Sequence, residues 1–154
     1  MNNIFFKLIG AHFLITMITI VVMSLAINTI TYFLVTLFSC ILYFYSGYIV
    51  TKLKSNWLNY FGVFTIGIIL WIICFALSPN SLNYKNDNEA GLWFIYQLYV
   101  MVKSPLNFID FLNEPFNLKR ELFILLLIPF IISVIQFSGG KLKIWKMKVD
   151  ESES

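Results

Sequence analysis

Acid–base chemistry within the long apolar segments of this sequence would come most directly from His12, the one histidine of the chain. Thr16 and Thr19 follow at helical spacing, so the three side chains would share one face of a helix. The next apolar segment carries a similar polar face. Its members are Thr36, Ser39 and Tyr43.

Two interpretations of these polar faces are open. The functional one is a polar path or a ligand pocket in which His12 accepts a proton. The structural one is that the two faces meet and hydrogen-bond to each other, as is common between membrane helices, at about 0.6 kcal/mol per bond. We favour the structural interpretation, and a lone histidine provides too few ligands for a metal site.

All eight Asp and Glu residues, and all eleven Lys and Arg residues, lie outside the four apolar segments delimited below. Ionisable residues inside a membrane usually mark function, so this distribution argues against a buried carboxylate relay for proton-coupled transport. The sequence also lacks the motifs of zinc proteases, serine hydrolases and nucleotide-binding proteins. We therefore expect no enzyme and no cofactor. The enzymatic alternative would use the extracytoplasmic carboxylates Asp110, Glu114 and Glu121.

Cys40 and Cys74 each lie deep within an apolar segment, without C-x-x-C spacing. This placement is typical of small residues that pack in a core, rather than of a disulfide, zinc or redox pair. The two cysteines therefore do not change the expectation that metal ions and cofactors are absent.

The composition indicates a membrane protein. The 154 residues are 59% hydrophobic and 12% charged, with a mean hydropathy of +0.80, whereas soluble proteins are roughly half apolar and a quarter charged. The net charge of +3 does not indicate nucleic acid, because the lysines are divided among the ends of apolar segments. Abundant Lys, Ile, Asn and Phe are typical of an AT-rich, bacterial genome.

Residues 8–50 contain no charged side chain. As one helix they would measure about 65 Å, twice the hydrocarbon thickness of a bilayer, so they must fold back on themselves. Asn28 and Thr31 favour a turn, because their side chains can hydrogen-bond to a turning backbone. The sequence thus predicts transmembrane helices at 9–27 and 32–50.

Two further transmembrane helices are predicted at 58–77 and 122–137. The first ends before Pro79, which disfavours a helical conformation of the preceding residue. The second ends before Gly139 and Gly140, which resemble a glycine C-cap. The predicted fold is an all-α polytopic membrane protein, in which four transmembrane helices form a single domain.

Residues 78–121 form the one sizeable connection. Its apolar part, 92–102, would cover only about 16 Å as a helix, so we expect extracytoplasmic amphipathic helices at the membrane surface. A re-entrant segment and a fifth span are the alternatives. Aromatic side chains exposed on this connection would suit a protein partner. The candidate partner-binding residues are Trp93, Tyr96, Tyr99, Phe108 and Phe111.

Positive charge orients the predicted spans, because loops retained in the cytoplasm are rich in Lys and Arg. Seven Lys residues fall on the side of the two termini, and four Lys or Arg residues fall on the other side. We therefore expect a multi-pass protein of the cytoplasmic membrane with both termini in the cytoplasm. The basic tail, 139–154, should contact anionic lipid headgroups. Its cations are Lys141, Lys143, Lys146 and Lys148.

The sequence favours a non-catalytic accessory, regulatory or protective subunit that binds another membrane component or a second copy of itself. The large aromatic connection between the third and fourth helices is the feature that favours this role. A small oligomeric permease or channel, lined by the two polar faces, is the first alternative. A membrane enzyme with extracytoplasmic carboxylates is the second.

Overall fold

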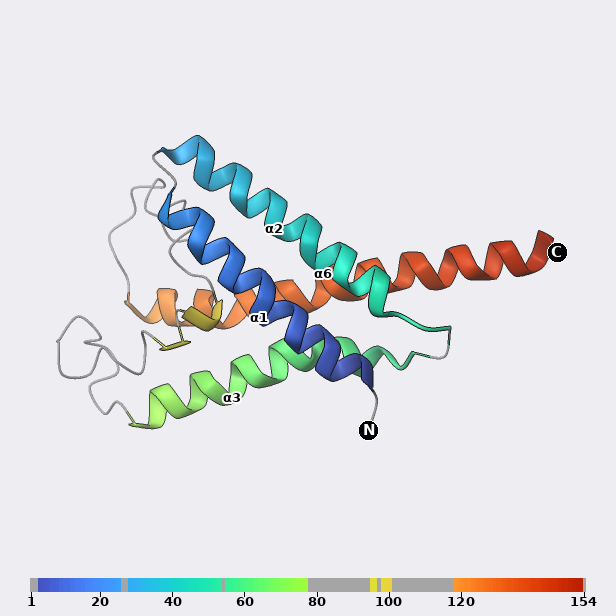
Figure 1. The fold of residues 1–154 in the computed structure, drawn as a ribbon. Helices are drawn as coiled ribbons and strands as arrows, with labels where there is room; N and C mark the ends of the chain where they lie inside the picture. Colours follow the sequence, from blue (N-terminus) through green and yellow to red (C-terminus); the bar gives the residue numbers. More distant parts are fainter. Residues whose placement is uncertain are drawn as a thin grey trace.

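The computed structural model describes residues 3–25, 28–53, 55–77, 95–96, 98–100 and 118–153. These residues are helical apart from short connections (Figure 1). The long helices are α1 (Asn3–Ser24), α2 (Thr29–Val50), α3 (Gly62–Leu77), which directly follows the 3-10 helix η1 (Trp57–Phe61), and α6 (Leu118–Glu153).

In the part of the chain that the structure describes, four helical segments are long and apolar enough to cross a membrane. A hydrocarbon core of about 30 Å requires roughly 20 helical residues, and each segment has at least this length. Leu14 and Met17 are 64% and 66% exposed, as expected for side chains that face lipid. The predicted fold class is confirmed, and the chain is a four-span helical membrane protein. The candidate spans are Ile4–Ser24, Ile30–Val50 and Trp57–Leu77, with the fourth span in the apolar first part of Leu125–Ser152, before Lys141.

The turn between the first two spans is organised by Asn28, as the sequence predicts. The Asn28 side-chain oxygen accepts hydrogen bonds from the backbone N–H of Thr31, at 2.9 Å, and from the Thr31 hydroxyl, at 2.8 Å. This arrangement is an N-cap, which satisfies a backbone donor that the first turn of a helix leaves without a partner. Helix α2 therefore begins at Thr29, three residues earlier than predicted.

Successive long helices run in opposite directions, so the start of α1, the end of α2, η1 and the C-terminal half of α6 lie together (Figure 1). Ile4, Leu8 and Tyr60 form a small apolar cluster there, and Phe137 packs against it. Lys143 donates a hydrogen bond from Nζ to the carbonyl of Ile49, at 3.0 Å. We call this side of the bundle the basic end, because Lys7, Lys52, Lys141 and Lys143 belong to it.

Helices α2 and α6 approach each other very closely. A Cβ atom added to Gly47 would overlap the carbonyl oxygen of Gln136, and one added to Gly139 would overlap the carbonyl oxygen of Phe44. Both glycines are buried. Small residues at such positions let the backbones of membrane helices approach each other closely.

The expectation that Gly139 and Gly140 end the last helix is wrong. Helix α6 continues through both glycines to Glu153 and is 36 residues long, or about 54 Å. The physical reason is packing: Gly139 lies against α2, and a Cβ on Gly140 would meet the Tyr60 ring at 2.5 Å. The basic residues that follow the fourth span are therefore helical, and Pro129 lies inside the same helix.

Between α3 and α6, the described residues are 95–96 and 98–100, which are helical. Tyr96, Tyr99 and Val100 belong to the main core with residues of α1, α2, α3 and α6. The parts of the predicted amphipathic connection at 78–94, 97 and 101–117 lie outside the described residues. They include Trp93, Phe108, Phe111, Asp110 and Glu114.

Candidate functional site

The polar faces of α1 and α2 meet in the interior of the bundle. His12 is fully buried, and its Nδ1 atom lies 2.9 Å from the Tyr43 hydroxyl, which is 3.5 Å from Oγ1 of Thr16. Farther along the same interface, the hydroxyls of Thr19 and Ser39 are 2.9 Å apart. We call these five residues the α1–α2 polar cluster.

Thr36, the sixth residue of the predicted polar faces, is bonded within its own helix. Its hydroxyl donates to the carbonyl of Tyr32, at 2.9 Å. The hydroxyl of Ser39 likewise donates to the carbonyl of Val35, at 2.8 Å, in addition to its contact with Thr19. Such bonds satisfy hydroxyl donors that have no water to bind in a membrane interior.

The two described tyrosines of the predicted partner-binding set are buried. The Tyr99 ring lies edge-on to the His12 ring, with centroids 4.6 Å apart, and its hydroxyl donates to the carbonyl of Val63, at 2.6 Å. The Tyr96 hydroxyl donates to the carbonyl of Leu125, at 3.2 Å. Both rings therefore tie the 95–100 segment to the spans of this chain, and neither is exposed to a partner.

Two polar residues outside the predicted faces also join the interior. The side-chain nitrogen of Gln136 lies 3.4 Å from the carbonyl of Leu8 and 3.4 Å from the Ser46 hydroxyl. The Ser133 hydroxyl accepts a hydrogen bond from the backbone N–H of Phe64, at 3.1 Å. Ser133 and Gln136 are three residues apart in an otherwise apolar segment, and this spacing is the sequence signal that could have identified them.

A cavity of about 180 Å³ lies beside the α1–α2 polar cluster. Hydroxyl-bearing residues of α1 and α2 line one part of it, and isoleucines of α6 line the other. This lining suits a small molecule that is mainly apolar and has one polar group. The lining residues include Thr19, Thr36, Ser39, Tyr43, Ile128 and Ile132.

Within the described ranges, no group of three or more His, Cys, Asp or Glu residues could hold a metal ion. Cys40 is half-buried, Cys74 is buried, and both are free thiols. The α1–α2 polar cluster thus consists of hydroxyl groups and one imidazole ring. The hydrogen bonds and ring contacts described above for this cluster lie inside the bundle, which is the pattern that the structural interpretation predicts.

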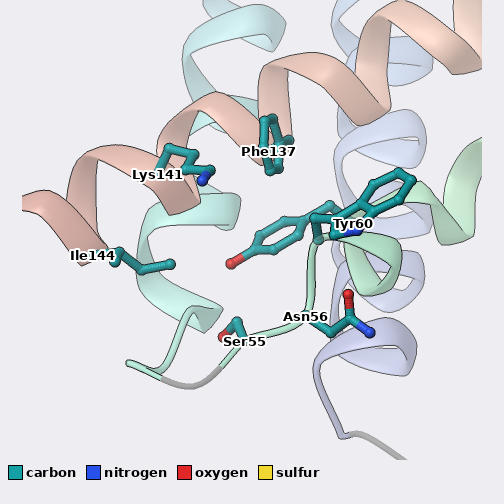
Figure 2. A pocket seen from close by; sticks show the side chains of 7 residues that line it. Ser55, Asn56, Tyr60, Phe137, Lys141 and Ile144 are labelled. Carbon is teal, nitrogen blue, oxygen red and sulfur yellow. The ribbon is translucent and has the colours of Figure 1, made fainter.

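The lysines that follow the fourth span have different environments. Lys143 faces α2, where it bonds to Ile49 and lies with Nζ 5.8 Å from the centroid of the Tyr48 ring. Nζ of Lys141 lies 5.4 Å from the centroid of the Phe137 ring and borders a second cavity, of about 190 Å³ (Figure 2). Lys146 and Lys148 are exposed on α6.

Comparison with protein-family models, curated proteins and solved structures gives no significant match. The site is therefore interpreted from its own geometry: a polar interior that is bonded across α1 and α2, and a basic end with a lined cavity.

Proposed function

We propose that this chain is a non-catalytic membrane protein that acts by binding another membrane component. The observation that carries the proposal is the C-terminal part of α6, which continues past the end of α2 (Figure 1). The bond between Lys143 and Ile49 marks the level at which α2 ends. Residues 144–153 extend about 15 Å beyond that level.

This extension of α6 exposes an aromatic ring and positive charges, as surfaces that bind a partner often do. Trp145 is 64% exposed, and Lys146 and Lys148 are exposed beside it. A headgroup layer is only about 5 to 7 Å thick on each side of a bilayer, so the last residues of the extension reach beyond it. A short helix with little packing is marginally stable in water. An acidic and apolar surface of a membrane-protein partner would stabilise it by packing on Trp145 and pairing with the lysines.

The distribution of positive charge supports a cytoplasmic position for the basic end and both termini. The lysines of the basic end lie at one side of the bundle, and an excess of lysine is the feature that retains loops in the cytoplasm. Cytoplasmic placement, and location in the cell membrane, are parts of this proposal. A cysteine-accessibility experiment on intact cells would test them, with Ser152→Cys expected to react with a permeant reagent only.

Site-specific photo-crosslinking in intact membranes tests the partner proposal. A benzophenone side chain at Lys148 should capture one discrete membrane protein, and Trp145→Ala in the same chain should reduce that capture. The matched control places the same probe at Met17, which is 66% exposed on a lipid-facing helix and should capture lipid alone. Identical products from both positions would contradict the proposal, as would capture that is unchanged by Trp145→Ala.

The cavity of about 180 Å³ favours a second candidate function, a small permease. Thr36 lines the cavity, and Thr36→Val would remove one hydroxyl from it. Thr65→Val is the matched control, because the hydroxyls of both threonines donate to the carbonyl four residues earlier, at 2.9 Å, but Thr65 is exposed on α3. A permease for the small, mainly apolar molecules that suit this lining predicts flux of one of them, such as isobutyramide, into proteoliposomes that Thr36→Val changes and Thr65→Val does not. Flux equal to that of empty vesicles would contradict this second function.

A further inference from the structure

The cavity at the basic end is formed by two elements that are far apart in sequence. Ser55 and Asn56 approach from the connection between α2 and η1, and Lys141 and Ile144 approach from α6 (Figure 2). Trp57, the first residue of η1, also lines the cavity. Its volume is about 190 Å³. The space is therefore bordered by a cation, an amide, a hydroxyl and an indole ring.

Aromatic rings form the part of the cavity nearest to the bundle. Tyr60 and Phe137 line it, with ring centroids 5.6 Å apart in an edge-to-face arrangement. The Tyr60 hydroxyl lies 2.6 Å from Oγ1 of Thr51. Tyr60 is therefore held in place by a buried hydrogen bond, and this wall of the cavity is built into the fold.

The cavity lies at the level of lipid headgroups. Helix α2 ends at Val50, and Trp57 is 58% exposed at the start of the third span. Exposed tryptophans at the ends of spans are typical of the membrane–water interface. Lys141 is only two residues from Lys143, which bonds to the last turn of α2. Lys141 can therefore reach the phosphate layer.

The charge around the cavity favours an anion. Among the four lysines of the α6 C-terminal part, Lys141 is the one that lines the cavity. Lys148 lies seven residues later, on the same face of the helix. The acidic residues nearest in the α6 sequence, Asp150 and Glu151, are nine or more residues from Lys141, or about 13 Å along the helix.

A row of aromatic rings leads from the cavity into the membrane. The Phe137 centroid is 6.5 Å from that of Phe61, Phe61 is 6.1 Å from Phe130, and Phe130 is 5.2 Å from Phe64. Phe130 is exposed, and the other three are partly exposed. An acyl chain could lie along this row while its phosphate occupies the cavity. A free phosphate ion has no apolar part that could pack against this row.

We propose that this cavity binds one anionic phospholipid, with the phosphate on Lys141 and an acyl chain along the row of phenylalanines between α3 and α6. The Asn56 amide nitrogen is a second donor for the headgroup, since its side-chain oxygen accepts from the N–H of Leu58, at 3.3 Å. This lipid site does not depend on the proposed protein partner. It adds a defined binding position to the general attraction of basic segments for anionic lipid.

Native mass spectrometry of the detergent-purified full chain tests the site, by counting retained lipids in titrations with phosphatidylglycerol. We expect one tightly retained phosphatidylglycerol per chain. Lys141→Gln should weaken its binding about fivefold, the effect of one lysine at a membrane surface. Ile144→Trp, which fills the cavity without changing the charge, should weaken it to a similar extent. Lys146→Gln is the matched control, since it removes an equal charge from another face of α6, and should weaken binding less than about twofold.

Three outcomes would overturn the proposal. Equal losses for Lys141→Gln and Lys146→Gln would show that only general charge attraction acts. Equal retention of phosphatidylcholine would show that the site does not distinguish an anionic headgroup from a zwitterionic one. Displacement of the bound species by millimolar inorganic phosphate would assign the cavity to free phosphate. Gel filtration and circular dichroism show whether each variant is folded. If the Lys141→Gln variant does not fold, the Ile144→Trp variant tests the same site.

Discussion

Replacing Gly139 with alanine should force α2 and α6 apart. The added Cβ would overlap the carbonyl oxygen of Phe44 and lie 2.9 Å from the carbonyl carbon and 3.1 Å from the backbone nitrogen of Tyr48. All three atoms belong to the backbone of α2. A flexible side chain could rotate away from such a contact, but a helix backbone can respond only by moving as a whole.

The magnitude follows from the distances. Carbon atoms in ordinary contact are about 3.5 to 4.0 Å apart, so relief of the overlap requires a shift of about 1 Å between the helices. Overpacking of this kind costs about 1 to 3 kcal/mol. The higher helix propensity of alanine offsets up to about 1 kcal/mol of this cost, because glycine is the weaker helix former. We therefore expect Gly139→Ala to lower the free energy of unfolding by about 1 to 2 kcal/mol.

Reversible unfolding in mixed micelles, followed by circular dichroism, measures this change. Gly10→Ala is the matched control, since the same methyl group on α1 would meet no atom within 4 Å. That variant should be as stable as the parent chain or more stable by up to about 1 kcal/mol. If Gly139→Ala and Gly10→Ala have the same stability, the close contact between α2 and α6 does not exist in the protein.

Three further substitutions test individual contacts by the same unfolding measurement. Asn28→Ala should lower stability by about 1 kcal/mol through loss of the N-cap of α2, while Asn28→Asp should preserve it. Tyr43→Phe should cost about 1 to 3 kcal/mol, because it leaves a ring nitrogen of His12 without this partner inside the bundle. Tyr99→Phe should cost about 0.6 kcal/mol, the usual value for a bond between membrane helices.

The spans and their first turn could be predicted because each depends on nearby residues. A bilayer sets the required length of an apolar helix, and the charge-free stretch 8–50 is about twice that length. Asn28 bonds to Thr31, three residues away, so its role is also visible in the sequence. Local information is sufficient wherever the partner atoms are within one helical turn.

The role of Gly139 and Gly140 could not be predicted in this way. Glycine after an apolar segment is equally consistent with a helix end and with a close approach of two helices. The choice depends on Phe44 and Tyr60, which are about 80 or more residues away in the sequence. At this site the contact between helices overrides the local preference of glycine to end a helix.

The α1–α2 polar cluster, too, could be predicted from the sequence only in part. Helical spacing predicted which side chains of α1 and α2 share a face, and five of the six residues bond across that interface. Spacing could not predict that Tyr99 covers His12, because the 95–100 segment has no periodic signal that fixes its depth. Its burial follows from the hydrogen bond to Val63 and from packing in the main core.

The interior and the basic end of the described bundle differ in what they can contribute to function. In the interior, the α1–α2 polar cluster bonds across the two helices, and bonds between membrane helices favour a fixed arrangement over an open path. At the basic end, by contrast, Lys141, Trp145 and Trp57 are exposed at or beyond the level where α2 ends. Exposed cations and aromatic rings at a membrane surface gain stability from lipid headgroups or from a partner. We therefore infer that the spans hold the basic end in place, and that binding occurs there.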